Sequence, residues 1–382
     1  MRMAALPAFL KRVLVCVCAT VFFFTGCATI PDSSELPVQF KVPVSVWQPV
    51  QRQQALRALA PEDRARLCPD DDATLFPPLL REVKLIGSLT NYNSVAQAFI
   101  VAISNYLPYA VAFGDRENVE RLRDYLIEAA ESRAYLQRYR NDFGINGYAP
   151  DNEPAYVQAL MLIPLSLAYD YLTQVYGRDD PGTIRIREWG DALVDAILGA
   201  GDRLQKGYDR WAAKAAGFGL WGAVSGNTKA LRAGWGLFSF GQSVVAQDGR
   251  HVYADLYSGT QAIKYLIMAI GMQVLAAEAF AAAGFEDVYA WKSSDGKGSL
   301  HDTVHWLMLY SGTVPGSYLG SHYHSTLKGP AWAEFYLRRF PGTATSRLIE
   351  QTINRPTKHG IYTGYFGGWT TCLVHPLEPA SR

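Results

Sequence analysis

Apolar residues recur along most of this chain with the spacing of an α-helix, and in one long stretch they cover nearly every face. Residues 262–283 are almost continuously apolar, as expected of a helix buried between other helices. Residues 154–176 are amphipathic, with Pro154 near the first turn and Gly177 after the last. Clear alternating strands are scarce. Because buried helices need other helices around them, the pattern predicts an all-α fold with two concentric helical layers.

Two further segments show the one-sided apolar pattern of helices that cover such a core. Their apolar faces consist of Val119, Leu122, Leu126 and Ala130, and of Trp189, Leu193, Ala196 and Ile197. Two layers of this kind describe an incomplete α/α toroid, which we predict for residues 51–382 as one unit. A helical-repeat solenoid is the alternative architecture, although the sequence shows no repeat of fixed period.

The N-terminal residues predict a bacterial lipoprotein signal. Basic residues precede an apolar stretch at 13–24, and two small residues then precede Cys27. We predict cleavage of residues 1–26 and lipidation of Cys27, with Ala28 in the next position favouring the outer membrane. The alternative, a transmembrane anchor, needs roughly 20 apolar residues. The domain would then face the periplasm.

Without residues 1–26 the chain holds 33 basic and 35 acidic residues. Such a balance excludes nucleic-acid binding through bulk positive charge, so an anionic ligand requires a local basic patch. The 49% share of hydrophobic residues excludes a disordered chain. Residues 27–50 contain several prolines and predict an extended tether. In an oxidising periplasm Cys68 and Cys372 could pair, a question that the sequence leaves open.

The histidines give a weak indication of a metal site. His301 and His305 lie one helical turn apart and, with a carboxylate, could bind zinc; partly buried histidines are the alternative. His322 and His324 are spaced two apart. The chain carries no zinc-protease motif, phosphate loop, dinucleotide fingerprint or nucleophile elbow, and we predict no metal and no other cofactor. Carboxylates that could pair for glycoside hydrolysis are Asp142, Asp151, Glu153 and Asp255.

Amides, cations, a histidine and phenols gather between residues 222 and 278. They are Asn227, Lys229, Arg232, Arg250, His251, Tyr257, Lys264 and Tyr265. These groups suit proton abstraction next to a carboxylate, in which an amide or cation stabilises the developing charge and a phenol or imidazole moves the proton. Taken singly, a residue such as Tyr265 is more often part of a core.

The order of these residues resembles the alginate lyase family, the α/α-toroid polysaccharide lyases that cleave uronate polymers by β-elimination. In that family an Asn-Asn-His-x-Tyr-Trp motif is followed by Ala-Gly-Trp, an Asp-Gly turn and Arg-Gly-x-x-Ala-x-x-Tyr-His. The matching residues here are Ala233, Gly234, Trp235, Asp248, Gly249, Gly259, Ala262 and Tyr265. The resemblance is convincing over about residues 220–290 and implies both the toroid and the lyase reaction.

Several motif positions carry other residues. Placed without gaps, Asn227 falls on the first motif Asn and Lys229 on the catalytic His. A shift of one residue would put Asn227 on the Asn that neutralises the substrate carboxylate. Ser258 stands in the position of the family's Arg, and Leu266 in that of the His after Tyr. Either other cations replace these groups or the chain has lost the chemistry.

The resemblance implies a catalytic set of Tyr265, Asn227 and His251. Tyr265 would act as base or acid, Asn227 would hold the carboxylate, and His251 would share the proton transfer. The predicted substrate-binding residues are Lys229, Arg232, Arg250, Tyr257, Lys264, Asn91 and Tyr92. The predicted function is a lyase for an alginate-like or glucuronan-like anionic polysaccharide. The alternatives are a non-catalytic glycan-binding lipoprotein of an exopolysaccharide system, or a glycoside hydrolase on the same toroid.

Overall fold

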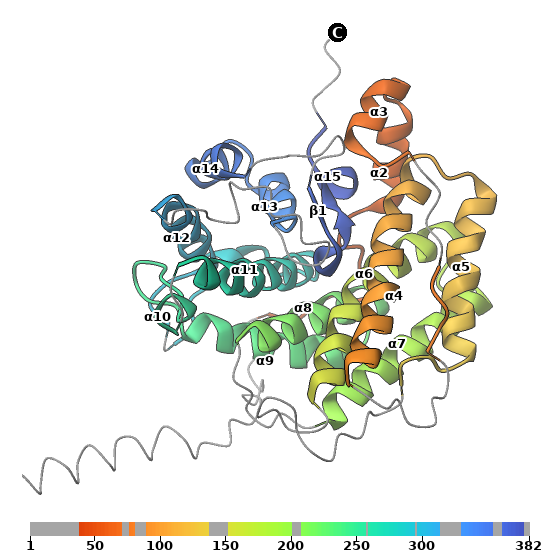
Figure 1. The fold of residues 1–382 in the computed structure, drawn as a ribbon, viewed down its shortest axis with the longest axis horizontal. Coiled ribbons are helices and arrows are strands. Elements are labelled where there is room, and N and C mark those ends of the chain that lie inside the picture. The colour runs from red at the N-terminus through yellow and green to blue at the C-terminus, as the bar shows by residue number, and fades with distance from the viewer. Residues whose placement is uncertain are drawn as a thin grey trace, which may run out of the picture.

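The structure, a computed structural model, describes residues 38–70, 76–80, 89–136, 152–200, 208–256, 259–294, 296–313, 330–353 and 361–377. Within these ranges the chain is predominantly α-helical (Figure 1). The helices are α2 (Pro49–Arg57), α3 (Pro61–Leu67), α4 (Leu89–Ala112), α5 (Arg116–Glu131), α6 (Asn152–Tyr176), α7 (Pro181–Gly199), α8 (Tyr208–Ser225), α9 (Thr228–Ser243), α10 (Tyr253–Leu256), α11 (Gly259–Ala282), α12 (Leu300–Thr313), α13 (Ala333–Arg339), α14 (Ala344–Thr352) and α15 (Thr370–Val374). Short 3-10 helices span Glu286–Tyr289 and Gly364–Phe366, and the strands β1 (Tyr362–Thr363) and β2 (Gly368–Trp369) pair antiparallel.

Four long helices, α4, α6, α8 and α11, form an inner layer. Each packs against the next in chain order, and α5, α7, α9 and α12 pack on the outer sides of α4, α6, α8 and α11 respectively (Figure 1). Almost every described side chain of α6 and α8 is buried. The arrangement confirms the predicted all-α fold and its incomplete α/α toroid.

Three inner helices are long and apolar enough to cross a membrane, judged by length and composition alone. The stretches are Val95–Ala112, Ala155–Tyr176 and Ala262–Ala282. Of the most apolar 18 residues in each stretch, 67%, 100% and 89% respectively are buried inside the protein. Because their apolar faces are covered by neighbouring helices, we interpret all three as core helices. The continuous apolar pattern at 262–283 is accordingly α11.

Two glycines allow the close contact between α8 and its outer partner α9. A Cβ atom on Gly222 would lie 2.5 Å from the backbone nitrogen of Leu231, and one on Gly234 would lie 2.7 Å from the nitrogen of Gly219. No side chain fits at such a distance from a backbone atom. The glycines therefore bring the two helix backbones together.

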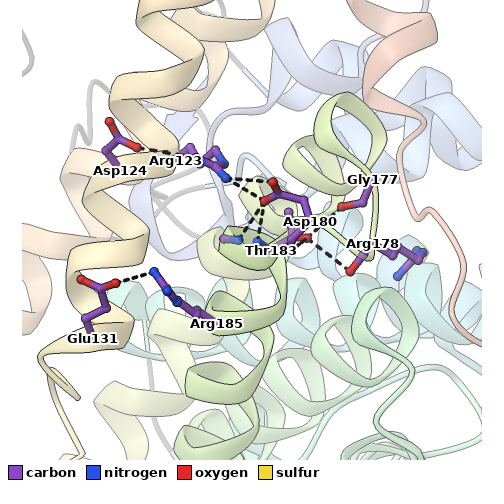
Figure 2. A network of polar contacts seen from close by, with 9 residues as sticks. Arg123, Asp124, Glu131, Gly177, Arg178, Asp180, Thr183 and Arg185 are labelled. Atoms are coloured by element: carbon purple, nitrogen blue, oxygen red, sulfur yellow. Dashed lines mark hydrogen bonds and ion pairs between the residues drawn. The ribbon is translucent and has the colours of Figure 1, made fainter.

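Polar contacts join the outer helices α5 and α7 (Figure 2). Asp180 caps α7 by accepting from the backbone N–H groups of Gly182 and Thr183 at 2.9 and 3.0 Å. The same carboxylate accepts two hydrogen bonds from Arg123 of α5, at 2.9 and 2.8 Å. Arg185 pairs with Glu131 at 2.6 Å, but both side chains are exposed, so this second pair contributes little.

The N-terminal segment 38–48 packs against the ends of the inner helices. The N–H of Val44 donates to the carbonyl of Ala223 at 2.8 Å. The hydroxyl of Ser45 donates to Asp170 of α6 at 2.9 Å. This part of the predicted tether is therefore bound to the domain.

The C-terminal end of the chain is joined to the N-terminal helices by a disulfide. Cys68, which follows α3, is bonded to Cys372 of α15, with their Cα atoms 4.7 Å apart. The pairing that the sequence left open is confirmed. Arg52 of α2 adds hydrogen bonds to the carbonyls of Thr371, Cys372 and His375. Together these bonds close the fold between residues far apart in sequence.

Candidate functional site

Helices α8, α9 and α11 carry most of the predicted site residues, and their directions decide which residues can meet. Close contacts between the helices show that α9 runs antiparallel to both α8 and α11. The contacts are Gly222 with Leu231, Gly234 with Gly219, Trp235 with Phe280, and Gly241 with Gln273. Since α8 and α11 are both antiparallel to α9, they run parallel to each other.

The parallel register places two tyrosines at the same end of the layer. Gly219 of α8 lies against Ala276 of α11, 57 residues later in the sequence. The same separation relates Tyr208, the first residue of α8, to Tyr265 in the second turn of α11. Because both helices rise about 1.5 Å per residue, and Gly219 also contacts Ala279 and Phe280, Tyr208 and Tyr265 lie within about one helical turn of each other along the helix axes. Both phenols are partly buried.

His251 lies beside Tyr208. It follows a turn in which Gly249 adopts a φ of +82° and approaches the carbonyl of Asp302 so closely that a Cβ atom would lie 2.2 Å away. The chain then returns to pair Val245 with His251. The imidazole meets the Tyr208 ring edge-on, with ring centroids 6.0 Å apart. Glycine at residue 249 is therefore what allows the turn to bring the histidine to α8.

Burial sets the charge state of these rings. His251 is only 3% exposed, and burial lowers the pKa of its imidazole to about 4. Burial also raises the pKa of the Tyr208 phenol. At neutral pH the pair is a neutral imidazole beside a neutral phenol. Because His251 has almost no exposed surface, a polymer cannot reach it directly, and it would act by positioning Tyr208.

Aromatic contacts hold the first turn of α8. Tyr208 stacks on Phe240 at 5.7 Å between ring centroids, and Trp211 packs on the same ring at 4.2 Å. The guanidinium of Arg210 lies 5.0 Å above the ring of Tyr156. These contacts fix an aromatic and cationic cluster, which we call the α8 start cluster: Tyr156, Tyr208, Arg210, Trp211, Phe240 and His251.

The predicted cation Lys264 belongs to the same end of the toroid. Its ammonium lies 5.9 Å from the centroid of the Tyr265 ring. Arg250, the residue before His251, instead pairs with Asp255 at 3.4 Å, and both side chains are largely exposed. The end of the layer with Tyr265 thus holds Lys264, Arg210 and Arg250 as cations.

The structure places Asn227 at the opposite end of α8, outside the cluster. Asn227 is the N-cap of α9: its Oδ1 accepts from the N–H of Ala230 at 2.9 Å, and its Nδ2 donates to Asp191 at 2.7 Å. The 18 residues of α8 separate Asn227 from Tyr208 by about 27 Å. Its side chain is used in a helix cap, and the structure does not bring it to Tyr265.

Two predicted cations accompany Asn227 at that end. Lys229 forms an ion pair with Asp195 at 2.7 Å, with both side chains 65% exposed. Arg232 is exposed one turn further along α9. Neither residue reaches the α8 start cluster, because α9 carries them along the far end of α8.

Other predicted positions lie partly or wholly outside the described residues. Tyr257 falls outside them, as do His322 and His324; Asn91 and Tyr92 lie in the first turn of α4, but their side chains are not described. His301 bonds through Nδ1 to the Tyr336 hydroxyl at 2.8 Å, and His305 to the Thr345 hydroxyl at 3.1 Å. Among the described residues no group of three potential metal ligands occurs.

Sequence reasoning missed Tyr208 and Arg210. The signal was present in the tetrapeptide 208–211, in which an aromatic residue precedes Trp211 by three positions, one helical turn, at the start of a long apolar segment. The family resemblance instead pointed to Asn227, the residue before the next helix. An asparagine before a helical run looks the same whether it caps the helix or binds substrate.

Comparisons with known proteins identify the fold. No family model and no curated protein matches the chain in sequence. Among solved structures, a tyrosine-to-phenylalanine variant of alginate lyase A1-III complexed with tetrasaccharide matches with a TM-score of 0.70 and 17% identity, covering 91% of this chain and 99% of that one. A histidine-to-alanine variant complexed with tetrasaccharide matches at 0.67 and 16%, covering 92% and 98%.

A third structure, alginate lyase A1-III from Sphingomonas species A1, matches with a TM-score of 0.64 and 16% identity, covering 87% of this chain and 96% of that one. The matches extend over almost the whole toroid, well beyond the segment in which the sequence motifs agree. At such low identity they establish the architecture. The chain therefore has the α/α-toroid fold of alginate lyase A1-III, at a sequence identity of 16–17%.

Proposed function

We propose that the protein is a polysaccharide lyase that cleaves a uronate-containing polysaccharide by β-elimination. The proposal is supported by Tyr208 and Tyr265 lying at the same end of the parallel helices α8 and α11, in a fold shared with a lyase solved with tetrasaccharide. If Trp211 is taken as the last residue of the family's Asn-Asn-His-x-Tyr-Trp motif, Tyr208 falls on its histidine. The site would then use two phenols where the family uses a phenol and an imidazole.

The reaction divides into two proton transfers. One phenol takes the proton from C5 of the uronate, the electron pair of that C–H bond forms the C4–C5 double bond, and the C4–O bond breaks. The other phenol gives its proton to the departing oxygen. A phenol serves as a base only when cations stabilise its phenolate. Lys264, next to Tyr265, would be the cation that stabilises the phenolate. Arg210 belongs to the same cluster, but it lies over Tyr156 and 3.8 Å from Asp209.

The test is formation of unsaturated ends, detected by ultraviolet absorbance, on alginate, glucuronan and other uronate polymers. Tyr265→Phe and Tyr208→Phe should each lower turnover by about 10²–10⁴-fold, because general acid–base catalysis contributes that much. Tyr176→Phe is the matched control: Tyr176 is partly exposed and packs under Arg123 of α5, away from the cluster. Near-normal turnover in folded Tyr265→Phe protein would refute its role. Binding of a uronate polymer without cleavage would favour the glycan-binding alternative.

We also propose that Cys27 carries a lipid that anchors the domain in the periplasm, on the outer membrane. Only the sequence before residue 38 supports this, because those residues lie outside the described ranges. Cys27→Ser should move the protein from the membrane fraction to the soluble fraction. Membrane association that is unchanged in the expressed variant would disprove lipid anchoring.

A further inference from the structure

A groove of about 810 Å³ lies at the other end of α11 from Tyr265. Its walls are the segment Ser45–Gln48, helix α2, the last residues of α11, helix α13, and the end of α15 with the chain that follows it. Ala281 lines it and lies 16 residues after Tyr265, which is about 24 Å along the helix. The groove is therefore separate from the α8 start cluster, and its volume is within the range of ligand sites.

Two arginines of α13 stand at this groove around a single carboxylate. Arg338 donates to Glu278 at 2.5 Å, and Arg339 donates to both oxygens of the same group at 2.5 and 3.0 Å. Glu278 is fully buried, whereas the arginine side chains are 26% and 27% exposed. Tyr289 also donates to Glu278, at 2.8 Å. These bonds hold both guanidinium groups in place. The single negative charge of Glu278 balances only one of their two positive charges.

A third guanidinium, that of Arg52, completes the cationic wall. Its hydrogen bonds go to three backbone carbonyls, at 2.7, 2.7 and 3.1 Å, which carry no net charge. Burial lowers the pKa of Arg52 to about 10, Glu334 opposes the shift and Arg338 adds to it. Glu334 is itself buried and accepts from Thr371 and His375. The positive charge of Arg52 is therefore only partly compensated by the protein.

The residue just before α2 has an uncommon backbone conformation. Gln48 has φ 55° and ψ 59°, in the left-handed region, and its side chain makes no cap bond to α2. Its N–H donates to the Ser45 hydroxyl at 3.0 Å. Residues other than glycine rarely adopt this conformation, and those that do cluster at functional sites. The apolar surface between the walls comes from Ala281, Ala282, Leu373 and Val374.

We propose that this groove is a second binding site for a carboxylate-bearing saccharide chain, apart from the catalytic end. Guanidinium groups bind carboxylates with two parallel hydrogen bonds, and the apolar surface suits the faces of sugar rings. The three arginines face the buried Glu278 and Glu334 and the exposed Glu286, which also interacts with Arg339, so the wall has no large positive surplus and suits a singly charged uronate better than a doubly charged phosphate. The exposed Glu286 on the rim opposes binding. The choice of a uronate rests on the proposed function.

The test is calorimetric titration of the Tyr265→Phe protein with a mannuronate trimer. Ala55→Trp, at an exposed position of α2 that lines the groove, should abolish one class of binding site. Gln51→Glu should weaken that class about threefold and Glu286→Gln should tighten it about threefold, the effect of one charge at about 6 Å in water. The matched controls are Gln54→Glu on α2 and Glu117→Gln on α5, both exposed and away from the groove.

The outcomes separate this proposal from the lyase proposal. Binding that disappears in Ala55→Trp supports the groove, whether or not any polymer is cleaved. Binding that is the same in Ala55→Trp, Gln51→Glu and Glu286→Gln overturns it, even if the lyase is active. Equal binding of a neutral glucose trimer, or displacement of the uronate by inorganic phosphate at lower concentration than by acetate, also overturns it.

Discussion

At the scale of single residues, burial determines what His251 can contribute. An imidazole that is 3% exposed cannot touch a polysaccharide, but it lies edge-on to Tyr208, whose phenol is partly exposed. The histidine that the sequence indicated as a proton carrier is thus better placed to orient a phenol than to replace one. The distinction depends on a few ångströms of depth, which sequence does not reveal.

The buried imidazole should make stability depend on pH. Burial lowers the folded-state pKa of His251 from 6.5 to about 4. Above pH 6.5 the imidazole is neutral in both the folded and the unfolded protein, and it does not reduce stability. As the pH falls toward 4 the unfolded protein takes up a proton that the folded protein does not, and stability is lost. Between pH 7.5 and pH 5 we expect this group to reduce the free energy of unfolding by about 2 kcal/mol. His251→Phe keeps an aromatic ring against Tyr208 and removes the titration.

Urea unfolding of wild type and His251→Phe at both pH values measures the difference. The variant should lose less stability than wild type on acidification, with other titrating groups common to both proteins. His301→Phe is a useful control, because His301 is only partly buried and its pKa is lowered by burial to a smaller extent. The same loss of stability in wild type and His251→Phe would show that His251 is not the buried titrating group.

At the scale of helices, the sequence predicted the long helices correctly, but it did not show which helix ends lie close together in the fold. The segments predicted at 154–176 and 262–283 are α6 and α11, because apolar periodicity over many turns has few other solutions. The sequence did not reveal the role of Asn227, because that role depends on which end of α8 lies near Tyr265. That depends on the direction of packed helices, which local sequence does not specify. The α8 start cluster was missed for the same reason.

Asn227→Ala tests the role that the structure gives this residue. Loss of the cap on α9 should lower the free energy of unfolding by about 1 kcal/mol, with a further contribution from the bond to Asp191. Turnover on a uronate polymer should stay near normal, since Asn227 lies about 27 Å from Tyr208. Asn227→Ser retains a capping oxygen and should recover part of the stability. A large loss of turnover in folded Asn227→Ala protein would return Asn227 to the catalytic set.

At the scale of the whole molecule, the toroid is incomplete and its two ends are joined by residues far apart in sequence. The segment 38–48, helix α2 and helix α15 meet where the disulfide between Cys68 and Cys372 closes a separation of 304 residues. The sequence indicated that the two cysteines could pair, since both lie in the part of the chain predicted to face an oxidising compartment. Their proximity follows from the closure of the toroid, which only the three-dimensional structure shows.

The disulfide between Cys68 and Cys372 should contribute measurably to stability. Replacing both cysteines, Cys68→Ala with Cys372→Ala, should lower the free energy of unfolding by about 2–5 kcal/mol, because the bond restricts the unfolded chain. Urea unfolding with and without reductant measures it: reductant should destabilise wild type and leave the double variant unchanged. Because the Cys372 carbonyl also holds Arg52, saccharide binding at the groove should weaken more than turnover at Tyr265. Equal stability of wild type and double variant without reductant would show that the bond does not hold the two ends together in solution.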